Sequence, residues 1–138
     1  GYGIDTFETA LDWNKVEPYM RDVQVRAEKV FESFGEKALV FAHLSHVYRQ
    51  GSTVYTSCIF RLADSPEETL ARWQAFKKVV SECIVEYGGT MSHQHGVGRD
   101  HKPLLAAEKG GQLGIDGIKA LVNSFDPDEV MNPEILVD

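Results

Sequence analysis

The chain has 138 residues and a formal net charge of −7 at pH 7, with 43% hydrophobic and 25% charged residues. This length suits one domain with a substantial core. The acidic balance argues against a nucleic-acid partner, which favours a basic face. No apolar run approaches the roughly 20 residues of a membrane-spanning helix, so we expect no integral membrane segment. Two cysteines are too few for a disulfide framework, which predicts buried, reduced thiols and a cytoplasmic location.

The first half of the sequence predicts a strand, a helix and a hairpin. Residues 4–9 are short and mixed, which favours an edge strand. Asp12 suits a helix N-cap, and apolar residues spaced three and four apart predict a helix over residues 12–34. Residues 38–48 and 53–61 are rich in β-branched and aromatic residues and flank a short turn, which predicts a β-hairpin.

The next segment begins with a capping box at Ser65 and a proline at the first helical position, which predicts a helix over residues 66–87. Gly88 suits its C-terminal end, and residues 90–93 favour a last short strand. Strand, helix, strand, strand, helix, strand is the element order of a ferredoxin-like α+β fold. We therefore expect an antiparallel sheet with two long helices on one face, which leaves the other face free for function.

After residue 98 the pattern changes to short helical segments. The sequence predicts a short helix over residues 103–109 and an amphipathic helix over residues 115–125, which ends before the Asp126–Pro127 pair. The expected organisation is a ferredoxin-like domain over residues 1–98, followed by a C-terminal helical extension and tail over residues 99–138.

The glycine-flanked pair His93 and His95 is the strongest candidate for chemistry. Side chains two residues apart in an extended segment point the same way, so both imidazoles are expected to face one site. One interpretation is a metal ion bound by both imidazoles and completed by Asp100, His101 or a strand residue, although no diagnostic ligand spacing is present. Another interpretation is that the two histidines lie in a polar loop and have no functional role. We favour catalysis or ligand contact, because imidazole exchanges protons near neutral pH.

Tyr55 is expected on the sheet face opposite the helices. It is either a half-buried packing residue or a phenol that donates a proton into the site, and the pattern alone favours packing. His43 and His46 lie three apart, so a regular strand would place them on opposite faces. The sequence contains no dinucleotide-binding fingerprint, P-loop or nucleophile elbow.

Three segments resemble the C-terminal part of FAD-linked oxidases of the vanillyl-alcohol oxidase type, and most closely the alkyldihydroxyacetonephosphate synthase branch of that family. The first is Asp5-Thr-Phe-Glu-Thr-Ala-Leu-Asp-Trp13. The second, Gly88-Gly-Thr-Met-Ser-His-Gln-His-Gly-Val-Gly98, is similar to the signature Gly-Gly-x-x-Ser-His-His-His-Gly-Val-Gly. The third, Asp126-Pro-Asp-Glu-Val-Met-Asn-Pro133, is similar to the ending Asp-Pro-x-x-Ile-x-Asn-Pro. In this order they span nearly the whole chain.

The resemblance implies which residues act. Tyr55 matches the position of the family's catalytic tyrosine, and His93 and His95 match the outer members of its histidine triplet. By the same likeness His95, Gly96 and Asn132 would contact the FAD cofactor, with no metal in the site. The family holds FAD mainly through an N-terminal domain with a glycine-rich loop, and nothing in this sequence resembles that domain. The missing domain is therefore an expected partner.

The resemblance also implies a function. In the synthase branch, an adduct at flavin N5 allows an acyl group to be exchanged for an alkyl group, which predicts a small-molecule or lipid-like substrate. This chain would form the substrate-side (cap) domain and would be inactive by itself. The resemblance is also compatible with a homodimer. Gln94 replaces the middle histidine of the triplet, which favours an FAD-linked 2-hydroxy-acid oxidase or dehydrogenase instead. A stand-alone ferredoxin-like ligand- or metal-binding module is the other alternative.

Overall fold

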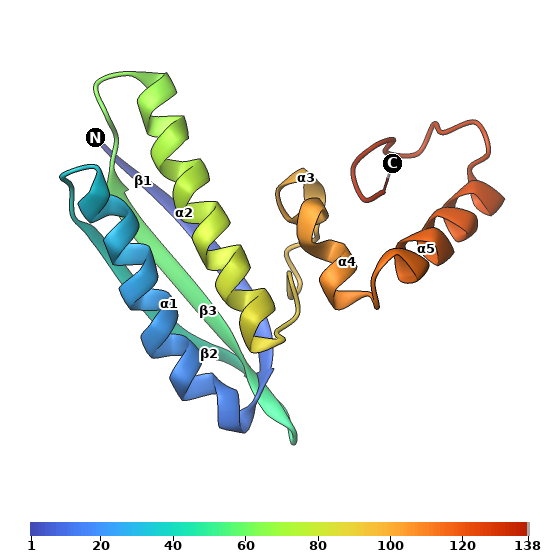
Figure 1. Cartoon of the computed structure of the whole chain (residues 1–138), viewed down its shortest axis with the longest axis horizontal. Coiled ribbons are helices and arrows are strands. Elements are labelled where there is room, and N and C mark those ends of the chain that lie inside the picture. The colour runs from blue at the N-terminus through green and yellow to red at the C-terminus, as the bar shows by residue number, and fades with distance from the viewer. Residues whose placement is uncertain (138) are drawn as a thin grey trace.

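A computed structural model describes residues 1–137 and shows an α+β arrangement (Figure 1). Three strands form an antiparallel sheet in the order β1-β3-β2, and two long helices, α1 and α2, cover one of its faces. The predicted fold class is thus confirmed. The elements are β1 (Tyr2–Asp12), α1 (Trp13–Ser33), β2 (Ala38–Val47), β3 (Gly51–Arg61), α2 (Pro66–Tyr87), α3 (Gly98–His101), η1 (Lys102–Leu104), α4 (Leu105–Glu108) and α5 (Gln112–Phe125).

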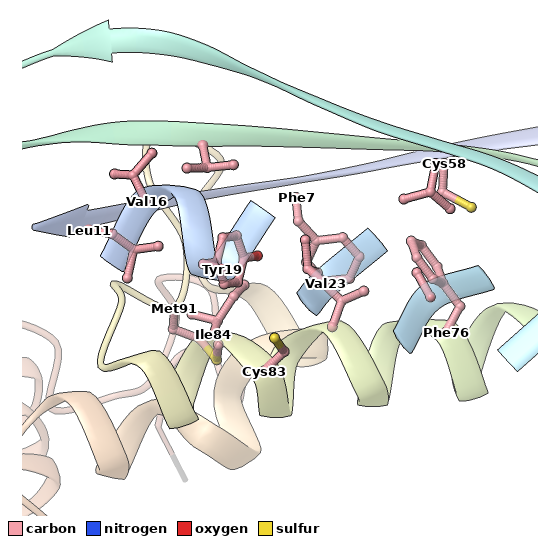
Figure 2. Packing of buried hydrophobic residues seen from close by; sticks show 14 of the residues in the cluster. Phe7, Leu11, Val16, Tyr19, Val23, Cys58, Phe76, Cys83, Ile84 and Met91 are labelled. Carbon is pink, nitrogen blue, oxygen red and sulfur yellow. The ribbon is translucent and has the colours of Figure 1, made fainter. Parts of the chain in front are cut away.

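The core lies between the sheet and the two long helices (Figure 2). Alternate residues of each strand face this core, among them Phe7 of β1 and Cys58 of β3, and they meet Val23 of α1 and Phe76 of α2. Phe7 and Phe76 pack edge to face with ring centroids 5.4 Å apart. The opposite face of the sheet, which no helix covers in Figure 1, is called the open face below.

Both cysteines are free and buried in this core. Burial raises the pKa of the Cys58 thiol to about 12 and that of the Cys83 thiol to about 11. Their predicted role as small buried residues is therefore confirmed.

The ends of α2 follow the predicted signals. The backbone N–H of Glu68 donates to the Ser65 hydroxyl at 3.1 Å, and Pro66 occupies the first helical position. Gly88 ends the helix in the left-handed conformation with φ +66°. Because the helix ends there, the chain turns back toward the edge of β1.

Residues 90–93 do not form the predicted fourth strand, although they run beside β1 where that strand would lie. Two backbone bonds join the segments, from Thr90 N–H to the Ala10 carbonyl (3.2 Å) and from His93 N–H to the Glu8 carbonyl (2.8 Å). Side chains take the remaining ladder positions: the Thr9 hydroxyl donates to the Thr90 carbonyl at 2.7 Å. The segment is therefore held at the sheet edge without becoming a strand.

The C-terminal extension begins at α3 and lies to one side of the sheet (Figure 1). The helix expected over residues 103–109 is divided between η1 and α4. Its buried contact is Leu105, whereas α5 has no buried residue and leaves Phe125 80% exposed. The division at residue 98 stays a prediction. Within residues 1–137, no helix is both long and apolar enough to cross a membrane.

The Glu108 carboxylate of α4 fixes the other side of the 90–93 segment. It accepts hydrogen bonds from the Met91 N–H at 2.7 Å and from the Thr90 hydroxyl at 3.1 Å. Burial by itself raises the pKa of Glu108, but hydrogen bonds from Lys109, Met91 and Thr90 outweigh burial and hold that pKa below its ordinary value of 4.5. The segment is thus clamped between β1 and α4.

We expect Gly89→Ala to destabilise the fold by about 1–3 kcal/mol, because the added methyl group would collide with the side chains of Thr9 and Leu11. Urea unfolding followed by circular dichroism measures the change. Gly117→Ala is the matched control: its methyl group meets no atom within 4 Å and lies in a helix, so stability should stay equal or rise. Equal effects of the two substitutions would contradict the close approach at Gly89.

Acid should weaken the clamp at Glu108. Since its pKa is lower in the folded chain, its stabilisation is complete above pH 4.5 and is lost as the pH falls through the folded pKa. Glu108→Gln should lower the free energy of unfolding at neutral pH by about 1 kcal/mol or more and reduce the further loss in acid. Urea titrations at several pH values test this, with Glu32→Gln, an exposed carboxylate of α1, as the unaffected control. An unchanged acid dependence in Glu108→Gln would refute the clamp.

Candidate functional site

The site lies on the open face of the sheet, where one row of side chains crosses all three strands. The register pairs Glu8 of β1 with Tyr55 of β3, and Tyr55 with His43 of β2. Directly paired residues project from the same face, so these three side chains are neighbours. The rings of His43 and Tyr55 stack with centroids 5.0 Å apart.

Glu8 is the centre of the site, although it is only 4% exposed. One carboxylate oxygen, Oε1, accepts a hydrogen bond from the Ser45 hydroxyl at 2.6 Å and lies 3.2 Å from His46 Nδ1 and 3.3 Å from His93 Nδ1. The other oxygen, Oε2, lies 3.2 Å from His95 Nε2. Four groups thus surround a carboxylate that has about four acceptor positions. We call these five residues the Glu8 cluster.

The electrostatics of the Glu8 cluster favour an ionised carboxylate. Burial by itself raises the pKa of Glu8, because it disfavours the charged form. Hydrogen bonds from Ser45 and His46, together with the charge and hydrogen bond of His93, outweigh burial and lower the pKa. The open face therefore carries a buried, ionised carboxylate to which several side chains donate hydrogen bonds.

A β-bulge in β2 brings two consecutive side chains to Glu8. Leu44 pairs with Val54 and Val47 pairs with Ser52, so β2 has one residue more than β3 in this interval. Both residues of the bulge bond to the same side chain of β3: the Ser45 hydroxyl to the Thr53 hydroxyl, and the His46 N–H to that oxygen at 2.8 Å. The expectation that His43 and His46 lie on opposite faces is wrong for this reason.

The segment after α2 supplies the other two imidazoles. Gln94 has φ +62°, a left-handed conformation that is uncommon for residues other than glycine. This turn, rather than strand alternation, places His93 and His95 against the two oxygens of one carboxylate. The Tyr48 hydroxyl lies 3.0 Å from Nε2 of His93, which links the cluster to an exposed phenol.

Tyr55, predicted as a catalytic residue, lies beside His95. Their rings meet edge to face with centroids 5.3 Å apart. The Tyr55 hydroxyl donates to the Thr6 hydroxyl at 3.3 Å. The structure therefore brings Tyr55, His93 and His95 together on the open face, while their catalytic roles stay predictions.

A cavity of about 590 Å³ adjoins the Glu8 cluster and unites the three predicted cofactor contacts: His95, Gly96 and Asn132 all line it. Lys77 and His101 line it as well. Burial and the neighbouring charge of Lys77 lower the pKa of His101, and its Nδ1 has no hydrogen-bond partner within the part of the chain that the structure describes. The cavity thus offers polar groups to a ligand, while the unpartnered nitrogen of His101 is itself buried.

Sequence reasoning missed Glu8, the residue that organises the site, and also Ser45 and Tyr48. A signal was present: Glu8 is a carboxylate between Phe7 and Thr9 in a strand, a pattern that places one charge on the face opposite the core. Its meeting with four partners depends on the bulge and on the turn at Gln94. Neither feature has a sequence signature here.

Three residues of the cluster could hold a metal ion. One ligand atom from each of Glu8, His46 and His93 lies within 4.8 Å of the others. Two imidazoles and a carboxylate form a ligand set that suits Zn²⁺ and other transition metals. The same contacts equally satisfy a hydrogen-bonded network, so geometry alone permits both interpretations.

Comparison with known proteins places this geometry in a family. Residues 1–135 match the family model of FAD linked oxidases, C-terminal domain. Alkyldihydroxyacetonephosphate synthase of Dictyostelium discoideum is 30% identical over 136 residues, which cover 97% of this chain and 21% of that protein. The uncharacterized FAD-linked oxidoreductase YgcU of Escherichia coli (strain K12) is 26% identical over 129 residues, which cover 92% of this chain and 26% of that protein.

The fold agrees with this match. A solved structure of alkyldihydroxyacetonephosphate synthase superposes with a TM-score of 0.64 at 22% identity, covering 96% of this chain and 21% of that one. The chain thus spans about a fifth to a quarter of the length of the curated relatives named above. It is a domain of the kind found in FAD-linked oxidases, which are enzymes. The family match, which extends over nearly every residue, shows that this chain belongs to the C-terminal domain family of FAD-linked oxidases.

Proposed function

We propose that this chain is the substrate-side domain of an FAD-dependent enzyme that exchanges an acyl for an alkyl group, as the name alkyldihydroxyacetonephosphate synthase of its relatives suggests. The substrate would be a small or lipid-like molecule, and the flavin would be held mainly by a domain outside this chain. By itself the chain would have no turnover. Its contribution would be one wall of the active site.

One observation carries this proposal. The phenol of Tyr55 and the imidazole of His95 are in ring contact beside a cavity, and His95 itself lines that cavity. A proton donor and a proton acceptor side by side at a concave, polar site are the elements of general acid–base catalysis. A sheet face used only for packing has no need of this arrangement.

The cavity residues fit the edge of a flavin ring. The imidazole of His95, the backbone at Gly96 and the carboxamide of Asn132 supply hydrogen-bond donors and acceptors, and a β-carbon added at Gly96 would meet no other part of the chain within 4 Å. These three residues would hold the cofactor on this side. Bound flavin would supply the electron-accepting ring that side chains lack.

Each residue of this chain would have a defined task. Tyr55, held by its bond to Thr6 and by stacking on His43, would hold or donate the proton at its phenol oxygen. His95 would accept a proton at a ring nitrogen. His93 would orient the substrate from the other side of Glu8. The rigid central strand β3 fixes Tyr55 in this geometry.

A related alternative within the family is an FAD-linked 2-hydroxy-acid oxidase or dehydrogenase. Gln94 stands where the synthase signature has its middle histidine, and glutamine does not exchange protons near neutral pH. The likeness to YgcU, an FAD-linked oxidoreductase, agrees with this alternative. The segment from Asp5 to Trp13 favours the synthase instead. We also propose a cytoplasmic location, which the two free thiols support.

A second candidate function is a ligand-binding module that uses the metal geometry of Glu8, His46 and His93. Tyr48, at 3.0 Å from the outer nitrogen of His93, would orient that ligand in the way that outer partners orient metal-bound histidines. This function needs no flavin. It is therefore separable from the first by experiment.

The flavoenzyme proposal predicts that Tyr55→Phe, made in the complete protein that contains this domain, lowers kcat about 100-fold or more while flavin absorbance is retained. The reason is loss of the phenol proton at an otherwise unchanged ring. Tyr2→Phe is the matched control, since Tyr2 is 73% exposed at the far end of the same sheet. Unchanged turnover in Tyr55→Phe would remove the catalytic role.

The metal-binding function predicts one-to-one binding of Zn²⁺ to the purified chain in calorimetry, reversed by a chelator. His46→Ala should abolish binding, because it removes one of three ligands. His43→Ala removes an imidazole of the same strand that lies outside the cluster and should leave binding intact. Absence of stoichiometric binding in the unsubstituted chain would exclude this function.

A further inference from the structure

The Glu8 carboxylate meets two imidazoles through Nδ1 and a third through Nε2. Nδ1 of His46 and Nδ1 of His93 face Oε1, whereas Nε2 of His95 faces Oε2, all at 3.2–3.3 Å. A neutral imidazole carries its proton on one nitrogen and a lone pair on the other. Which nitrogen carries the proton decides what the opposite side of the ring can do.

An ionised carboxylate offers lone pairs and no proton. Any ring nitrogen that faces it must therefore carry the hydrogen, since two lone pairs at this distance repel each other. Glu8 meets the condition: the Ser45 hydroxyl already donates to its Oε1 at 2.6 Å, and carboxylates are ionised at neutral pH. The protonated nitrogens are then Nδ1 of His46, Nδ1 of His93 and Nε2 of His95.

We propose that Glu8 is a positioning residue that fixes the tautomers of His46, His93 and His95, and thereby leaves Nδ1 of His95 as the proton acceptor beside the cavity. His95 lines that cavity and touches the ring of Tyr55. In the opposite tautomer its acceptor nitrogen would be turned to Glu8 and lost to a substrate. The carboxylate thus selects the nitrogen that does the chemistry.

The same constraint gives His93 a different role from His95. With its proton on Nδ1, its outer nitrogen Nε2 carries the lone pair and accepts from the Tyr48 hydroxyl at 3.0 Å. Tyr48 is exposed. A continuous line of polar atoms therefore runs from Tyr48 through His93 and the two oxygens of Glu8 to His95, and it connects the acceptor with the protein surface.

The assignment of tautomers stands on the contacts of this chain alone, but its use in a reaction rests on the proposed flavoenzyme function. Two separate measurements keep these apart. The first observes the ring nitrogens of the 138-residue chain directly, without flavin or substrate. The second measures turnover of the complete enzyme.

Imidazole nitrogen spectra of the ¹⁵N-labelled chain, recorded at an alkaline pH at which the rings are neutral, test the assignment. We expect the Nδ1–H form for His46 and His93 and the Nε2–H form for His95. The wild-type spectrum decides by itself: His93 in the Nε2–H form, or His95 in the Nδ1–H form, would overturn the proposal.

Glu8→Gln tests the cause. The amide has the shape of the carboxylate but only one acceptor oxygen, and its NH₂ group needs an acceptor. At least one of the three rings should therefore switch its protonated nitrogen. Glu32→Gln, a change of the same kind on the exposed side of α1, should leave all three unchanged. No switch in a folded Glu8→Gln chain would show that Glu8 does not set the tautomers.

In the complete enzyme, Glu8→Gln should lower kcat about 100-fold or more with a smaller change in KM, because the acceptor is misplaced rather than the substrate lost. Glu32→Gln, an exposed carboxylate of α1, is the unaffected control. Expected tautomers with unchanged turnover in both Tyr55→Phe and Glu8→Gln would refute the flavoenzyme function alone. Expected tautomers with turnover lost only in Tyr55→Phe would refute the role of Glu8 in the reaction.

Discussion

The buried charge of Glu8 is the constraint on which the site depends. A carboxylate with 4% exposure is costly unless donors replace the water it has lost, and the chain supplies donors from two separate segments, β2 and the segment after α2. The bulge in β2, the left-handed turn at Gln94 and the attachment of residues 90–93 to β1 all bring a donor to this one anion. The geometry of the open face is therefore a consequence of satisfying Glu8.

The two faces of the sheet divide stability from chemistry. The face toward α1 and α2 is apolar and closely packed, with residues such as Phe7, Cys58 and Phe76 almost without exposure. The open face carries the imidazoles, the phenols and the carboxylate. Because successive residues of a strand alternate between the faces, each catalytic candidate on β1 or β3 is flanked by core residues that fix its position. The core residues thus hold the site residues in place, although they are not themselves part of the site.

Local signals in the sequence predicted the fold well. Helix caps at Ser65 and Gly88, apolar spacing and the hairpin turn depend on neighbouring residues, so the sequence alone predicts them. The flanking glycines indicated His93 and His95 as site residues, and the family resemblance added their roles. The Glu8 cluster was missed because it depends on register across three strands and on an irregularity in one of them. The predicted strand at 90–93 failed for a similar reason: the side chains of Thr9 and Glu108 occupy the hydrogen-bonding groups that a ladder would use.

The bulge between Leu44 and Val47 has a consequence for how the length of this hairpin can vary. It adds one residue to β2, and that single addition lets both Ser45 and His46 reach Glu8 on the open face. Loss of one residue within this interval would leave a single residue opposite Thr53, so Glu8 would lose either the Ser45 hydroxyl or the His46 imidazole. A residue gained or lost at positions 49–50 of the exposed turn would leave the alternation of both strands intact. Insertions and deletions at the tip of the hairpin are thus compatible with the site, whereas those between Leu44 and Val47 are not.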